Sequence, residues 1–325
     1  MTKQTKPAST RAAVASSGAS ASGASASSSG AMSAVGADRP FLPLLVLLFI
    51  GSGCAALIYE VVWQQMLSLI VGSSAISLGV VLGTFMGGMC AGSLLLSRFV
   101  SRKQHPLRVY AFLELGIAAS GLVLLGVLPL MSKLQVAIGL GGFPGLLVSG
   151  FFCAIVLLPP TLMMGATLPA ISRFVETTPR GVSWLGFFYG GNIAGGVVGC
   201  LLAGYYLLRL YDVQVASGVA IVLNVAVVLL AFALAKNLPY ESNAKEEPTG
   251  AKPKLFNAPA GSMPVYITIA LSGFTALASE VVWTRLLSLN LGATTYTFSL
   301  ILAVVLAGLG LGSSTGAVLA RTVEN

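Results

Sequence analysis

Eight long apolar segments with very few charged residues constrain what this chain can fold into. Hydrophobic residues make up 56% of the sequence and charged residues only 9%, whereas soluble domains are about 25% charged. A helix needs about 20 apolar residues to cross a bilayer. The segments therefore predict an all-α, polytopic membrane protein with about eight transmembrane helices, at residues 41–63, 74–98, 108–130, 145–172, 183–208, 213–235, 264–284 and 293–320.

The lysines and arginines fall unequally on the two sides that these spans define. If the N-terminus lies inside, 15 of the 18 basic residues are on the inner side, and only Lys133, Arg209 and Arg285 are on the outer side. Such a bias is typical of the cytoplasmic side of membrane proteins, so the N-terminus is predicted to be cytoplasmic. The net charge of +8 does not indicate nucleic acid as a partner, because no basic patch interleaves with aromatic residues.

Composition divides the chain into four parts. Residues 1–38 are rich in Ser, Ala and Gly and are predicted to be a disordered tail. Residues 39–235 hold six of the spans, and residues 236–262 form a polar linker that we expect on the cytoplasmic side. Residues 263–325 hold the last two spans, and the chain stops directly after the second of them.

One segment occurs twice in this sequence. Ser52–Trp63 returns as Ser272–Trp283, and from Ser52 to Gly72 twelve of twenty-one positions are identical. Repeats in hydrophobic sequence are typical of membrane folds built from two related halves. We therefore expect residues 39–235 to be one half and residues 263–325 to be the first two helices of a second, incomplete half. On this interpretation the chain is a fragment or a shortened relative of a longer protein.

Both copies of the repeat place a carboxylate in an apolar helix, at Glu60 and Glu280. Each lies about 25 Å from its predicted helix start at 1.5 Å per residue, which is the outer third of a layer about 30 Å thick. A carboxylate there needs a partner or a watery cavity. It could form a cation or proton site, or it could be a polar clamp at the helix end, with Trp63 and Trp283 as interface anchors.

Two other polar residues lie within predicted spans. Asn192 stands among glycines and could bridge two helices or line a pore, so it joins Glu60 and Glu280 as a candidate substrate-binding residue. Glu114 lies near the inner end of its span, shortly after Arg108. We expect its side chain to snorkel to the interface or to form an ion pair.

Glycines recur at four-residue spacing in three spans, which places them on one helix face and lets backbones approach closely. This spacing predicts helix packing or, alternatively, helices that slide during a transport cycle. The candidate packing residues are Gly83, Gly87, Gly88, Gly92, Gly191, Gly195, Gly308 and Gly312.

Signatures of catalysis and metal binding are absent from the sequence. There is no GxSxG, HExxH or Walker lysine motif, and the glycine-rich runs lie inside apolar spans. The four cysteines lie in different spans and have no metal-ligand spacing. We therefore expect no catalytic residue, no metal ligand and no cofactor in this chain.

Three motifs resemble the membrane domain of bacterial spermidine synthase-like proteins. They are the two Ser-Gly-x-x-Ala-Leu-x-x-Glu-Val-Val-Trp segments, the run from Met164 to Pro169 and the run from Tyr189 to Gly196. The resemblance covers residues 41–320. It implies a major-facilitator-like arrangement of helices in a bacterial inner membrane, followed in the family by a soluble aminopropyltransferase-like domain.

The resemblance implies a function only in part. The family's enzymatic domain resembles a methyltransferase fold, and no segment of this chain corresponds to it, so aminopropyl transfer cannot be assigned to any residue here. We expect a transporter-like membrane module that binds or passes a polyamine or another small cation. The alternative is a membrane anchor or scaffold for a cytoplasmic enzyme or partner, such as an aminopropyltransferase-like protein.

Overall fold

The computed structural model describes residues 41–71, 75–100, 104–138, 142–175, 179–238, 262–292 and 294–323. The predicted disordered tail at residues 1–38 and nearly all of the polar linker lie outside these described residues. Residues 43–325 form one compact unit of contacts.

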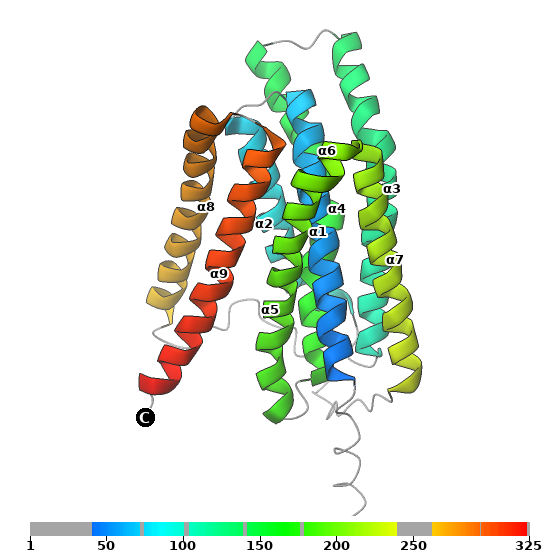
Figure 1. Cartoon of the computed structure of the whole chain (residues 1–325), viewed down its shortest axis with the longest axis vertical. Helices are drawn as coiled ribbons and strands as arrows, with labels where there is room; N and C mark the ends of the chain where they lie inside the picture. The colour runs from blue at the N-terminus through cyan, green and yellow to red at the C-terminus, as the bar shows by residue number, and fades with distance from the viewer. Residues whose placement is uncertain are drawn as a thin grey trace, which may run out of the picture. The chain divides into compact units, whose positions relative to one another are not determined.

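The described residues form helices and no strands, which confirms the predicted all-α membrane fold. Eight helical segments are long and apolar enough to cross a bilayer, as Figure 1 shows. The fifth is composite, since α5 passes through a π-helix, η2, into the short α6. The elements are α1 (Leu42–Val71), α2 (Ala75–Phe99), α3 (Pro106–Ile138), α4 (Gly142–Val175), α5 (Pro179–Leu201), η2 (Leu202–Leu207), α6 (Leu208–Leu210), α7 (Val213–Asn237), α8 (Met263–Leu291) and α9 (Thr295–Val323).

Several helices are longer than their apolar segments. The predicted ends of the first and seventh spans, at residues 63 and 284, are wrong, because α1 continues to Val71 and α8 continues to Leu291. The extra turns contain polar residues such as Gln64 and Gln65, which end an apolar run but are good helix formers. The length of these helices therefore follows the helix propensity of their residues, whereas hydropathy marks only the apolar part of each helix.

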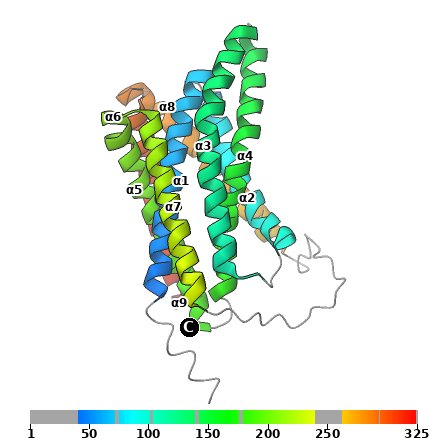
Figure 2. The same cartoon turned by 90° about the vertical axis from the view of Figure 1, so that its right-hand side faces the viewer.

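Consecutive membrane-crossing segments run in alternating directions (Figures 1 and 2). Extensive packing joins α2 to α4, α3 to α7 and to α4, and α5 to α9. Helix α8 packs against α9 and α2 only to a small extent, and most of its described side chains are exposed. The repeated helices α1 and α8 therefore differ in environment, because α1 runs through the main hydrophobic core.

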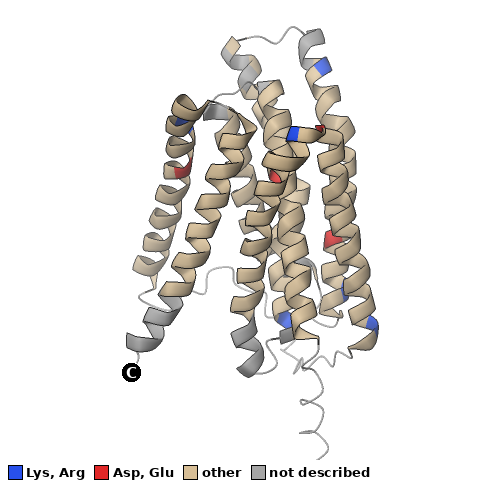
Figure 3. Ribbon diagram, in the orientation of Figure 1, with Lys and Arg blue, Asp and Glu red and all other residues tan. Residues whose placement is uncertain are grey.

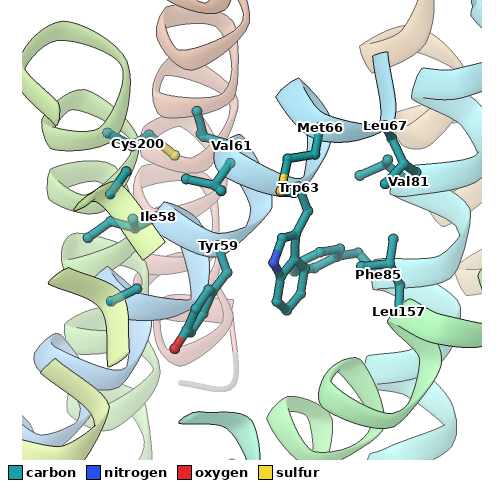
Figure 4. Close-up of a cluster of buried hydrophobic side chains, with 14 of the residues drawn as sticks. Ile58, Tyr59, Val61, Trp63, Met66, Leu67, Val81, Phe85, Leu157 and Cys200 are labelled. Carbon is teal, nitrogen blue, oxygen red and sulfur yellow. The ribbon is translucent and has the colours of Figure 1, made fainter. Parts of the chain in front are cut away.

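The core is built around the C-terminal half of α1 (Figure 4). Trp63 stacks on Tyr59 with ring centroids 5.0 Å apart and lies 5.7 Å from the ring of Phe85 on α2. Trp63 is only 1% exposed, so the expectation that it anchors α1 at the membrane interface is wrong. Its indole packs between helices instead of lying among lipid headgroups.

Four of the candidate packing glycines lie in close helix contacts. A methyl group on Gly88 or Gly92 of α2 would overlap Thr161 or Leu162 of α4, and one on Gly195 of α5 would overlap the backbone of Ile50 in α1. Gly191 also faces α1, at Val46.

The other four candidate glycines have open surroundings. No described atom lies within 4 Å of a methyl group built on Gly83, Gly87, Gly308 or Gly312. Gly83 lines an open, mostly apolar groove of about 350 Å³ between α2 and α4. Glycines at four-residue spacing therefore lie at close helix contacts in some places and at open positions in others.

Charged side chains are sparse along the helices (Figure 3). Lys133, Arg209 and Arg285 lie toward the C-terminal ends of α3, α6 and α8. Because α3, the α5–α6 segment and α8 run in the same direction, these three basic residues lie toward the same end of the helices.

Candidate functional site

Glu60 on α1 and Glu280 on α8 occupy equivalent positions in the repeat, and the fold brings them together. Both are buried, at 2% and 8% exposure, and the charge of Glu280 acts electrostatically on Glu60. Each glutamate lies 11 residues before the C-terminal end of its helix. The duplicated carboxylates, called the carboxylate pair below, thus lie at equivalent positions of their helices and within electrostatic range of each other.

The polar face of α8 is directed toward this pair. The buried side chains described on α8 are Glu280 and Thr284, which are four residues apart and so share one helix face. The apolar side chains of α8, by contrast, are largely exposed; Val265, Ile269, Phe274 and Trp283 are each more than half exposed. A membrane helix that turns carboxylate and hydroxyl groups inward and apolar groups outward points to a polar interior between α1, α2, α8 and α9.

A cavity of about 90 Å³ lies one turn beyond the carboxylate pair. Most of the side chains around it are polar, and one is basic. A polar cavity needs roughly 10–15 Å³ for each water that it holds, so this one has room for several waters or for a small hydrophilic group. Its lining residues are Val61, Gln64, Gln65, Ser68, Ser77, Leu78, Thr284, Arg285, Ser288, Thr294, Thr295 and Phe298.

Several buried polar atoms near the pair have no hydrogen-bond partner among the described residues. They are Oε1 of Glu60, Oε1 of Gln64 and Oγ1 of Thr284. A buried polar atom without a partner costs about 1–3 kcal/mol. Three such atoms on facing helices mark a place where water or a bound ligand would be stabilising.

Hydrogen bonds link other residues around the cavity. The Thr295 hydroxyl on α9 donates to Oε1 of Gln65 on α1, and the Ser288 hydroxyl donates to the backbone oxygen of Thr284 at 2.6 Å. The first of these bonds joins the two chain segments that the linker separates.

The π-helix η2 lies beside this region. A methyl group on Gly204 of η2 would overlap the side chain of Ser299 on α9, and Cys200, just before η2, lies within electrostatic range of Glu60 and Glu280. π-helical turns are rare and occur often at functional sites. Nothing in the local sequence separates a π-turn from an α-turn, so sequence reasoning missed this feature.

Glu60 lies 3.5 residues past the midpoint of α1, about 5 Å along the axis toward its C-terminal end. The helix continues for eight residues beyond its predicted end. The expected position of Glu60 in the outer third of the membrane stays a prediction.

Asn192 lies elsewhere, at the contact between α5 and α1. A methyl group on Gly53 would overlap the backbone and the side-chain oxygen of Asn192. Gly53 precedes Glu60 by two turns, and Asn192 does not line the cavity described above. The structure therefore brings two of the three candidate binding residues together and places the third in a close helix contact.

Glu114 is fully buried, so the expectation that its side chain snorkels to the interface is wrong. Its Oε1 accepts a hydrogen bond of 2.5 Å from the hydroxyl of Ser52 on α1. The partner could not be found from sequence, because Ser52 and Glu114 are 62 residues apart.

The sequence also failed to single out the other polar residues around the cavity, namely Gln64, Thr284, Ser288 and Thr294. One signal was present, since Gln64 and Thr284 each follow a repeated glutamate by four residues and so share its helix face. The residues of α9 carry no comparable signal, because their approach to α1 is a tertiary contact.

Comparisons of this chain with protein-family models, with curated proteins and with solved structures find no match.

Proposed function

We propose that this multi-pass membrane protein is a transporter-like module that binds a small cation at Glu60 and Glu280. One observation carries the proposal: two buried carboxylates from duplicated helices lie within electrostatic range of each other, and one of their oxygens has no described partner. Like charges in a low-dielectric interior repel strongly. A cation shared between them removes both the repulsion and the unsatisfied oxygen.

The surroundings of the pair narrow the class of cation. The cavity of about 90 Å³ beyond the pair has room for an ammonium group or a hydrated ion, but not for a large organic molecule. Arg285 lines this cavity. The positive charge of its guanidinium group disfavours another positive charge close to it. One terminal ammonium group of a polyamine fits these conditions when the rest of the chain extends away from Arg285.

The motifs that resemble spermidine synthase-like membrane domains support a polyamine as the cation. On this proposal the protein lies in a bacterial inner membrane with a cytoplasmic N-terminus, and an aminopropyltransferase-like domain or protein is its partner. The segregation of Lys133, Arg209 and Arg285 to one end of the helices supports that orientation, since outer segments of membrane proteins carry few basic residues.

A second candidate function is a rigid membrane anchor for a cytoplasmic partner. The close glycine contacts between α2 and α4 and between α1 and α5 favour it, because backbones in direct contact leave little room for helices to move. In that case Glu60 and Glu280 contribute to assembly only.

Ligand-induced stabilisation separates the two candidates. The full chain in lipid nanodiscs is heated with and without spermidine at constant ionic strength, alongside the variants Glu60→Gln, Glu280→Gln and the double variant. We expect spermidine to raise the unfolding temperature of the unmodified protein, as a ligand that binds only the folded state must. The shift should shrink in each single variant and vanish in the double variant.

Controls make this result specific. Ser279→Ala changes an exposed polar residue next to Glu280 and should keep the full shift. A bulky quaternary ammonium compound, added at the same total positive charge as spermidine, tests whether positive charge alone raises the unfolding temperature. An equal spermidine shift in the double variant and the unmodified protein would leave the anchor as the better account.

A further inference from the structure

A second polar cluster lies between α1 and α3, away from the cavity. Ser52 and Tyr59 on α1 are seven residues apart and share one helix face. They meet α3 at a constant sequence offset, since Ser52 bonds to Glu114 and the Tyr59 ring lies against Gly121. The same offset relates Leu48 to Tyr110. The two helices run parallel here, with a polar stripe along their contact.

The hydrogen bonds of this stripe leave two oxygens unsatisfied. The Ser52 hydroxyl donates to Oε1 of Glu114 at 2.5 Å, and the Tyr110 hydroxyl donates to the backbone oxygen of Leu48 at 3.3 Å. Oε2 of Glu114 and the hydroxyl of Tyr59 are buried and have no hydrogen-bond partner among the described residues. Both residues have zero exposure.

No described cation of the protein neutralises Glu114. Among the side chains that the structure describes, the buried charged types are Glu60, Glu114 and Glu280, with no buried lysine or arginine. Besides Glu60 on α1, the buried polar or titratable groups of the helices around Glu114 are neutral: Ser52, Cys54 and Tyr59 on α1, Tyr110 on α3, Ser149, Cys153, Thr161 and Thr167 on α4, and Ser217 and Asn224 on α7. An ionised carboxylate buried among neutral groups is costly.

A proton fits this place better than a metal ion. The Ser52 hydroxyl already directs its hydrogen to Oε1 of Glu114, and that contact is direct at 2.5 Å. A metal ion needs lone pairs from several oxygens and a space of its own, whereas a proton on Oε2 needs neither. Protonation also turns the unsatisfied oxygen into a neutral O–H group.

We propose that Glu114 is a proton-binding site between α1 and α3, held by Ser52 and separate from the Glu60–Glu280 pair. A hydronium ion of the aqueous phase gives up the proton and becomes water, and the new O–H bond converts the carboxylate to a carboxylic acid. The two sites share α1, because Glu60 follows Tyr59 and projects about 100° away from it. The hydrogen bond from Ser52 therefore connects Glu114 to the helix that carries Glu60.

Infrared difference spectroscopy tests this proposal directly. The full chain in nanodiscs is titrated with acid and base in H₂O and D₂O, and the carbonyl stretching bands of protonated carboxylic acids are recorded. We expect a band that is present in the unmodified protein and in the Glu60→Gln, Glu280→Gln double variant, and absent in Glu114→Gln. An unchanged band in folded Glu114→Gln would overturn the proposal.

A second variant covers the case in which Glu114→Gln does not fold. Ser52→Ala removes the hydrogen bond to Oε1 and should move the same band to higher frequency. Ser149→Ala is the matched control, since this buried serine bonds only to Gly145 of its own helix among the described contacts, and it should leave the band in place. A band at the same frequency in Ser52→Ala as in the unmodified protein would also reject Glu114 as its source.

Discussion

Trp63 and Trp283 occupy the same position in the two copies of the repeat and have opposite environments. Trp63 is 1% exposed and packs between Tyr59 and Phe85, whereas Trp283 is 59% exposed. The same contrast holds for Ser52 and Ser272 and for Gly53 and Gly273. The repeat therefore supplies matched pairs in which one residue type is compared inside and outside the core.

Quenching by brominated lipid should separate the two tryptophans. Trp283 should be quenched, because most of its side chain is exposed on a membrane-crossing helix, and Trp63 should be protected. The measurement compares the fluorescence lost in brominated and ordinary nanodiscs for Trp63→Phe and Trp283→Phe, each combined with Trp184→Phe so that one tryptophan remains. Removal of Trp283 should abolish most of the quenching; equal quenching in both variants would contradict the packing described for α1.

Gly53→Ala should destabilise the protein more than Gly273→Ala. A methyl group on Gly53 overlaps the backbone of Asn192, whereas no described atom lies within 4 Å of one on Gly273. Overpacking of this kind costs about 1–3 kcal/mol, while alanine at the open position should be neutral or slightly favourable in a helix. Thermal unfolding in one detergent checks the order, and a reversed order would refute it.

Gly92→Ala and Gly83→Ala make a second comparison, within α2 alone. The methyl group at Gly92 meets the backbone of Leu162 on α4, and the one at Gly83 enters an open groove. We expect a loss of about 1–3 kcal/mol at Gly92 and almost none at Gly83. Similar midpoints of unfolding in the two variants would show that α2 and α4 are not in direct contact at Gly92.

Ser52→Ala should lower the free energy of unfolding by roughly 1–3 kcal/mol, because a buried carboxyl group then loses its hydrogen bond. Ser272→Ala changes the equivalent, exposed serine of the second copy and should cost little. Denaturant titrations of the two variants provide the measurement. An equal cost at both positions would mean that the bond to Glu114 contributes nothing to stability.

Thr284→Val should have opposite effects on folding and on cation binding. Its buried hydroxyl oxygen has no described partner, so its removal should raise the stability of the empty protein by about 1 kcal/mol. The loss of a polar group beside the carboxylate pair should reduce the stabilisation that spermidine gives. Thr275→Val, at an exposed position where the hydroxyl bonds to its own helix, should change neither quantity.

Hydropathy predicted the number of membrane-crossing segments because each span needs one long apolar run. It could not predict that α1 and α8 continue past Trp63 and Trp283, since Gln64 and Thr284 interrupt the apolar run without breaking the helix. The repeat identified Glu60 and Glu280, but their approach depends on how α8 packs against α2 and α9.

The burial of Glu114 was missed for a similar reason, because the hydroxyl that holds it belongs to another helix. Glycine spacing was ambiguous from sequence. It places residues on one face, but only the neighbouring helix decides whether that face is in contact, as at Gly92, or open, as at Gly312.

The π-helix between α5 and α6 changes the direction in which the side chains beyond it point around the helix axis. A π-turn holds one residue more than an α-turn, so the side chains beyond Leu207 are rotated by about 100° relative to an uninterrupted α-helix. Removing one residue from Leu202–Leu207 would restore regular winding and turn Tyr205 away from Tyr296 of α9, whose ring lies 5.7 Å from it. The direction in which side chains point at the C-terminal end of this segment therefore depends on the number of residues in a single turn.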